Sequence, residues 1–245
     1  VSRMTSSSLA TRYLLGAIGV GLVQSAGASG THGTDVGALA TSGVHAASGS
    51  KAAAVASPIA SPEVDKKITS PLRYLTVHAS GVQKLLASSP GDTLPPRLRE
   101  PVSEMINAAF DFQELSRLTL GAHWIERTPE ERAEFVSVYR GIVEKRNFDS
   151  FVKFYREGNI QYLTEEVSAD KASVDAQIPV NRELVDITYR LHRIDDRWRI
   201  YDLVIDDVST AEGNRKMYSR YLAKHSYAEL VDRLKVQLAR LGRQD

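Results

Sequence analysis

The sequence predicts an α+β fold in which a curved antiparallel sheet of about four strands is covered on one side by helices. Two observations predict this class. Apolar residues recur at helical spacing in the first and last thirds of the folded part, and strict alternation of apolar and polar residues marks strands between them. The turns between these strands are too short for helical crossovers, so neighbouring strands must run antiparallel.

Four helices are expected before the sheet, beginning near residues 71, 96, 112 and 129. Ser70 and Asp111 supply capping side chains for the first and third of them. The fourth start is the most complete, because Thr128 is the cap, Pro129 takes the first helical position and Glu131 the third. The apolar face of this long helix continues to Gly158.

Strands are expected over residues 160–167, 172–180, 185–191 and 198–208. Asp195-Asp196 has the position of a hairpin turn, whereas Asp206-Asp207 falls inside the last strand. Consecutive strand residues point to opposite faces, so the latter two carboxylates are not expected to share a proton. Capping boxes at Ser209 and Ser226 begin the two final helices.

Residues 1–28 have the pattern of a secretory signal peptide. Arg3 and Arg12 precede an apolar run over 13–23, and Ala26 and Ala28 form an A-x-A cleavage site. This run is much shorter than the about 20 residues that span a bilayer. We therefore expect export through the inner membrane, cleavage of the leader, and a soluble periplasmic protein.

Residues 29–68 are rich in Ala, Gly, Ser and Thr and contain no aromatic residue. Such a segment buries too little apolar surface to offset the entropy of ordering it, so a disordered linker is expected. The folded domain is then predicted over residues 69–241.

Composition excludes several functional classes. Lys plus Arg number 31 against 30 for Asp plus Glu, a balance that argues against nucleic-acid binding. The chain has no cysteine, hence no disulfide, thiolate metal site or cysteine nucleophile. It also lacks the glycine-rich phosphate loops and the zinc and serine-hydrolase motifs. The sequence thus predicts no nucleotide, metal or other cofactor.

Aromatic residues occur on many of the predicted helices and strands that a curved sheet would bring together. They could fill an ordinary core, or several could line an apolar cavity in the mouth of the sheet. Composition alone leaves both interpretations open.

Two groups of residues resemble the MlaC (toluene-tolerance, Tgt-type) family of periplasmic phospholipid-binding proteins, over about residues 68–241. The first group is Phe110-Asp111-Phe112, Leu120-Gly121, Trp124, Thr128-Pro129 and Glu134-Phe135. The second is the run from Trp198 to Ile205, followed by Val208-Ser209, Arg215 and Tyr218. Asn147-Phe148 and Gly213-Asn214 depart from the Thr-Tyr and Asn-Tyr of the family.

The resemblance implies a fold similar to nuclear transport factor 2-like domains, with an apolar cavity for the acyl chains of a phospholipid. It implies a carrier, not an enzyme, with phospholipid as cargo. Its partners would be an outer-membrane MlaA-type lipoprotein complex and an inner-membrane ABC transporter with an MCE-domain protein. The expected lining residues are Phe135, Tyr139, Ile142, Phe151, Tyr189, Leu203, Ile205 and Met217. Arg215 is expected at the headgroup rim.

Three alternatives stay open at this point. A hopanoid-associated paralogue would share the fold. A cavity-type isomerase or dehydratase would use Asp186, Asp202 or His192, although Asp186 and His192 share the strand face opposite the apolar one. A structural adaptor would show a packed core without a void for a ligand.

Overall fold

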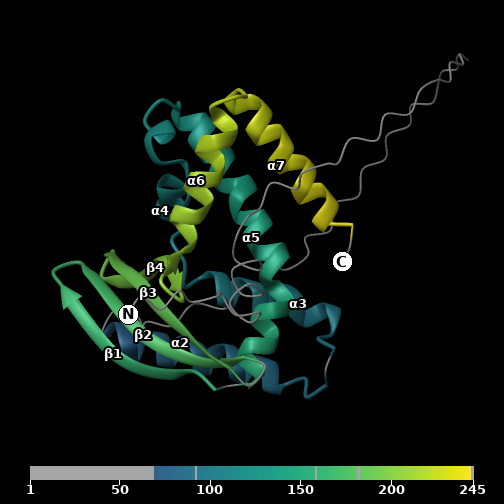
Figure 1. Cartoon of the computed structure of the whole chain (residues 1–245). Helices are drawn as coiled ribbons and strands as arrows, with labels where there is room; N and C mark the ends of the chain where they lie inside the picture. The colour runs from purple at the N-terminus through teal and green to yellow at the C-terminus, as the bar shows by residue number, and fades with distance from the viewer. Residues whose placement is uncertain (1–68, 92, 158, 181–182, 244–245) are drawn as a thin grey trace, which may run out of the picture. The chain divides into compact units, whose positions relative to one another are not determined.

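A five-stranded antiparallel sheet with helices against one face makes up the described part of the chain (Figure 1). The computed structural model describes residues 69–91, 93–157, 159–180 and 183–243, which all fall in one compact unit. The predicted signal peptide (1–28) and linker (29–68) lie outside the described residues.

The strands follow one another across the sheet in the order β1-β2-β3-β4-β5, and every neighbouring pair is antiparallel. They are β1 (Gln161–Ser168), β2 (Lys171–Val180), β3 (Glu183–Ile194), β4 (Arg197–Ile205) and β5 (Val208–Ser209). The predicted α+β class with an antiparallel sheet is therefore confirmed, with one short strand more than the four expected.

The extra strand arises because the predicted strand over 198–208 is wrong at its end. β4 stops at Ile205, and Asp206 and Asp207 form a turn with φ of 43° and 65°. Two successive residues in the left-handed region give the tight turn that suits the twist of a hairpin. Asp195 and Asp196 adopt the same conformation between β3 and β4, with φ of 48° and 63°, as predicted for that pair.

Helices with a capping signal begin where that signal predicts, and the helix that begins at the expected Pro96 does so without a capping side chain. The helices are α2 (Pro71–Ala87), α3 (Pro96–Asn107), α4 (Phe112–Leu120), the 3-10 helix η2 (Gly121–Trp124), α5 (Pro129–Glu157), α6 (Thr210–Leu222) and α7 (Tyr227–Leu241). The Asp111 carboxylate accepts hydrogen bonds from two backbone N–H groups of α4, and Ser226 forms a complete capping box with Glu229.

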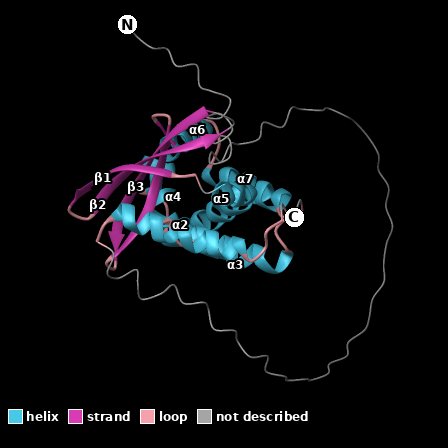
Figure 2. Cartoon of the chain, turned by 90° about the horizontal axis from the view of Figure 1, so that it is seen from below, coloured by secondary structure: helices cyan, strands magenta, loops and turns pink. Residues whose placement is uncertain are grey.

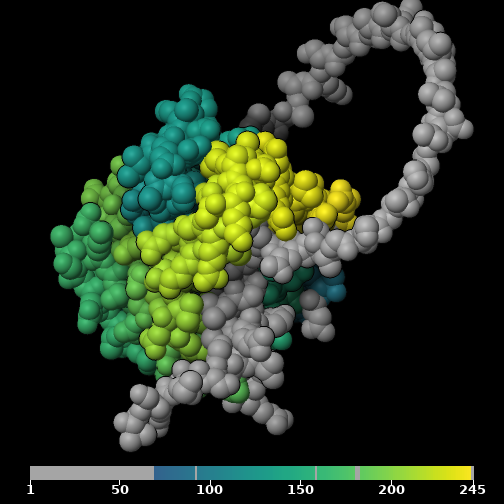
Figure 3. All heavy atoms as spheres, turned by 45° about the horizontal axis from the view of Figure 1, so that its top comes forward, coloured from purple at the N-terminus to yellow at the C-terminus, as the bar shows by residue number. Residues whose placement is uncertain are grey.

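The helices form two groups that share α5. α2 lies along the sheet, and α3 continues beyond the sheet, where it packs on α2 and α5 (Figure 2). At the other end α4, α6 and α7 gather around the first half of α5, and α6 and α7 lie side by side on the surface (Figure 3). One apolar core lies between the sheet and α2, and a second among α4, α5, α6 and α7. α5 runs from the helical end, where it packs on α7, to the sheet end, where it packs on α2 (Figure 1).

Candidate functional site

An apolar cavity of about 40 Å³ lies between the covered face of the sheet, α2 and the second half of α5. Its walls consist of aliphatic and aromatic side chains with a few uncharged polar groups. The lining residues are Leu75, His78, Phe110, Asn147, Ser150, Phe151, Phe154, Tyr155, Tyr162, Ile178, Ile187, Tyr189, Ile200 and Leu203. None of these described residues is Lys, Arg, Asp or Glu.

Strand alternation turns the apolar side chains of the sheet towards this cavity. On β3, Ile187 and Tyr189 are buried, while Asp186 and Thr188, which alternate with them, face the open side of the sheet. Tyr189 is paired across the sheet with Leu203 of β4, and Ile187 with Ile205. A bulge in this pairing next to Arg190 keeps Leu191 and Ile200 on the same buried face.

Helical spacing supplies the opposite wall. Asn147, Ser150, Phe151 and Phe154 are three or four residues apart on α5, so they share one face of the helix. A second void of about 20 Å³ lies closer to the helical core, and Phe110, Phe151 and Leu203 line both voids. These three side chains therefore form the partition between the two voids.

The predicted lining residues divide into three groups. Phe151, Tyr189 and Leu203 line the cavity, and Tyr139 lines the smaller void. Ile205 is buried in the sheet core. The remaining three, Phe135, Ile142 and Met217, lie in or against the core formed by α4, α5, α6 and α7. A lipid-binding role for each of the eight stays a prediction, and their positions favour Phe151, Tyr189 and Leu203 over Ile142, which lies in the helical core.

The expected lining residues lie on the sheet, α5 and α6, and none of them lies on α2. In the structure α2 contributes Leu75 and His78 to the wall, and the segment before α4 contributes Phe110. Phe110 pairs with Ile200 through a short parallel bridge at the edge of β4. Helical periodicity marks Leu75 as buried, but it does not indicate which strand or helix that face meets.

Burial changes the titration of the tyrosines around the two voids. It raises the pKa of Tyr139 to about 12, although hydrogen bonds from Thr119 and Asn214 to its hydroxyl act in the opposite direction. Burial also raises the pKa of Tyr155, Tyr162 and Tyr189 above the usual value. The hydroxyls therefore stay neutral in the folded protein and can serve as hydrogen-bond donors.

We expect the protein to lose stability as the pH rises above about 10. A neutral phenol whose pKa is higher in the folded state than its usual value of 10.0 stabilises the fold fully below pH 10. That contribution disappears as the pH rises towards the folded value of about 12. Urea unfolding between pH 9 and 12 should show the loss, together with delayed appearance of tyrosinate absorbance. Titration of every tyrosine near 10 without loss of structure would contradict this expectation.

The Asp202 carboxylate joins the sheet to the helical end of the fold. Its side chain is buried, and Ser209 Oγ donates to Oδ2 at 2.7 Å. Thr210 Oγ1 and the backbone N–H of Ala211 donate to Oδ1 at 3.1 and 3.0 Å, and Arg190 Nη1 lies 3.1 Å from Oδ2. Asp202 thus binds the first turn of α6, where a negative charge is favourable.

Asp186, Asp202 and His192, the residues expected for a cavity-type isomerase or dehydratase, do not lie together in the structure. Asp186 and His192 are on the open face of β3, away from the cavity. The Asp186 carboxylate accepts a hydrogen bond from Gln177, and His192 lies 2.9 Å from the Asp111 carboxylate. Since Asp202 is held by α6, no two of the three could act on one substrate in the cavity.

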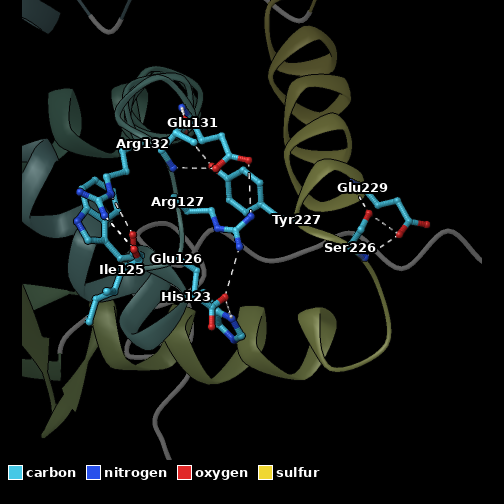
Figure 4. Close-up of polar contacts among 11 residues, drawn as sticks. His123, Ile125, Glu126, Arg127, Glu131, Arg132, Ser226, Tyr227 and Glu229 are labelled. Carbon is cyan, nitrogen blue, oxygen red and sulfur yellow. Dashed lines mark hydrogen bonds and ion pairs between the residues drawn. The ribbon is translucent and has the colours of Figure 1, made fainter.

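Two arginines connect the start of α5 to the segment before it and to α7 (Figure 4). Arg132 donates from Nε and Nη2 to the carbonyl oxygens of Trp124 and Ile125, at 3.0 and 3.1 Å. Arg127 lies over the ring of Tyr227 of α7, whose hydroxyl donates to the Glu131 carbonyl oxygen at 2.8 Å. These contacts fix the helical end and leave Ile125 79% exposed.

Arg215, the expected rim residue, lies on α6 beside Gly121 rather than in the cavity wall. A Cβ at Gly121, where φ is 57°, would approach Arg215 Cδ to 2.8 Å, and the guanidinium is 3.7 Å from the Glu212 carboxylate. Both side chains of this pair are about half exposed, a setting in which ion pairs contribute little.

We expect Arg215→Ala to change both lipid content and the free energy of unfolding only slightly. The ion pair is exposed, so its loss should cost at most about 1 kcal/mol. Mass spectrometry of bound lipid and urea unfolding would measure the two effects. Complete loss of bound lipid would instead make Arg215 a headgroup ligand.

The described residues contain no group of three or more His, Asp or Glu side chains placed to hold a metal ion. Among the helices in the described ranges, none has the length and apolar character needed to cross a membrane.

Comparison with known proteins gives one family and one fold. The sequence profile of the MlaC protein family matches residues 79–236. A phospholipid-binding protein from Ralstonia solanacearum, solved in complex with a phospholipid, has a similar structure with a TM-score of 0.58. The two sequences are 17% identical, and the alignment covers 69% of this chain and 97% of the other. At that identity the likeness concerns the fold. No curated protein matches the chain significantly.

Proposed function

Because this chain belongs to the MlaC protein family, we propose that it is a periplasmic phospholipid carrier without catalytic activity. The observation that supports this most strongly is the apolar cavity between the sheet, α2 and α5. Its described lining contains no Asp, Glu, Lys or Arg, and His78 is its one titratable side chain besides the tyrosines. Acyl chains need such a wall, because it must replace most of the apolar contacts that they leave in a membrane.

To hold two acyl chains, the cavity must widen. Burying a methylene group is worth about 0.8 kcal/mol, so two acyl chains represent about 20 kcal/mol or more. Pockets for drug-sized ligands have volumes of about 300–1,000 Å³, against about 40 Å³ here. Phe110, Phe151 and Leu203, which separate the two voids, are the side chains whose movement would join them.

The headgroup is proposed to stay in solvent at the cavity mouth, since burying a phosphate without a full set of donors is very unfavourable. Phe110 also borders an open cleft of about 580 Å³, whose wall includes the arginines Arg140, Arg197 and Arg199 and the carboxylates Asp111 and Asp195. The arginines outnumber the carboxylates, so this cleft offers an anionic headgroup positive charge that the closed cavity does not contain.

Transport between membranes would follow from loading and unloading by partners. We propose an outer-membrane MlaA-type lipoprotein complex and an inner-membrane ABC transporter with an MCE-domain protein as the two ends of the route. The chain has no nucleotide-binding motif to drive net transport. Each partner can set direction only through its different affinities for the lipid-loaded and lipid-free carrier.

A vesicle assay tests the carrier function. Donor vesicles of phosphatidylethanolamine and phosphatidylglycerol with a fluorescent phospholipid are mixed with unlabelled acceptor vesicles, with and without the protein. We expect the protein to speed transfer and to retain about one phospholipid after separation from the vesicles. Uptake of a hopanoid but not of phospholipid would favour the hopanoid-associated alternative, and no uptake would contradict the proposal.

A further inference from the structure

The cavity wall contains one buried side chain whose polar atoms have no partner. Asn147 is 1% exposed, and neither its Nδ2 nor its Oδ1 has a hydrogen-bond partner within the protein. It lies on the face of α5 that carries Phe151 and Phe154 into the cavity wall. Because both atoms are unpaired, the observation holds whichever way the amide is turned.

Such a residue is costly in an apolar cavity. A buried polar group without a partner destabilises a fold by about 1–3 kcal/mol, and an apolar side chain of similar size avoids the penalty. Leucine has nearly the shape of asparagine and would suit the neighbouring phenylalanines. The carboxamide is therefore expected to have a partner that arrives with the ligand.

The cavity chemistry restricts that partner to an uncharged acceptor. The described lining offers no arginine or lysine to neutralise a phosphate or carboxylate, and its one histidine, His78, already contacts the Met105 carbonyl oxygen through Nε2 at 2.8 Å. An unpaired N–H is tolerated less well than an under-satisfied carbonyl oxygen, so the amide N–H groups carry the greater need. The uncharged acceptor that a diacyl phospholipid brings is an ester carbonyl.

We propose that Asn147 donates a hydrogen bond to an ester carbonyl of the bound lipid and so makes the cavity selective for ester-linked over ether-linked chains. The inference rests on the proposed lipid-carrier function and adds to it a specificity-determining residue. In this arrangement the cavity holds each chain up to its ester linkage, with the charged headgroup outside.

The test compares two lipids of equal chain length and headgroup, diacyl and dialkyl phosphatidylglycerol, on the full chain. A single hydrogen bond corresponds to about a two- to tenfold preference for the diacyl lipid. Asn147→Leu should bind the dialkyl lipid about as well as the wild type does and should lose the preference. Ser116→Ala is the matched control: Ser116 is also buried and unpartnered but is not in the cavity wall. It should keep the preference.

Equal binding of both lipids by the wild type, or a preference that survives in Asn147→Leu, would overturn the inference. The wild-type comparison needs no variant, so it decides the matter even if Asn147→Leu folds poorly. Failure of the wild type to bind either lipid would overturn the carrier function as well, which distinguishes the two failures. Thermal unfolding of lipid-free protein gives a second readout, and Asn147→Leu should unfold at an equal or higher temperature than the wild type.

Discussion

The Leu203→Trp substitution is expected to abolish lipid binding and leave the free energy of unfolding nearly unchanged. Leu203 lines both voids between the sheet and α5, so an added ring can enter space that is already empty. A lipid would then have to compete for the cavity with the covalently attached indole ring. Mass spectrometry of bound lipid and urea unfolding of the same preparation measure the two quantities.

Ile142→Trp is the matched comparison for that variant. Ile142 is fully buried in the core of α4, α5, α6 and α7 and is not among the residues that line the described voids. Overpacking a filled core costs about 1–3 kcal/mol, and lipid content should persist. If Leu203→Trp were the destabilised variant and still carried lipid, the cavity would not be the lipid site.

The Asp202→Ala substitution is expected to destabilise the protein by about 3 kcal/mol or more. Removal of the carboxylate leaves two hydroxyls and the Ala211 N–H in a buried region without an acceptor, and each such group costs about 1–3 kcal/mol. Asp186→Ala is the control, because that exposed carboxylate accepts from Gln177 on the open face of the sheet. Urea unfolding of both variants is the measurement. Similar losses in the two variants would mean that Asp202 does not hold α6 to the sheet.

The sequence predicted the elements of the fold because their signals are local. Ser70, Asp111, Ser209 and Ser226 each accept a backbone hydrogen bond at the start of a helix, as their spacing indicates. The predicted strand over 198–208 passes the true end of β4 because apolar Val208 resumes after Asp206-Asp207, although an Asp-Asp pair is also a turn signal, as at 195–196. The same pair of residues in the same conformation ends both strands.

The candidate site was harder to predict, since it depends on which faces meet. Phe151 and Phe135 both lie on the apolar face of α5, yet one meets the sheet and the other meets α6 and α7. Helical periodicity predicts that both side chains are buried, but it does not indicate whether each packs against the sheet or against other helices. The sequence did not indicate Asn147 as a site residue, because an isolated polar residue on a helix is usually exposed. Its one distinguishing feature in the sequence is that Asn147-Phe148 departs from the Thr-Tyr of the family.

Native mass spectrometry of the full chain, purified from the periplasm of a phospholipid-containing host without detergent, tests the central claim most directly. We predict a mass increment of one phospholipid that is absent from Leu203→Trp and present in Ile142→Trp. A ligand-free wild-type protein that also gains no mass after incubation with phospholipid vesicles would contradict it.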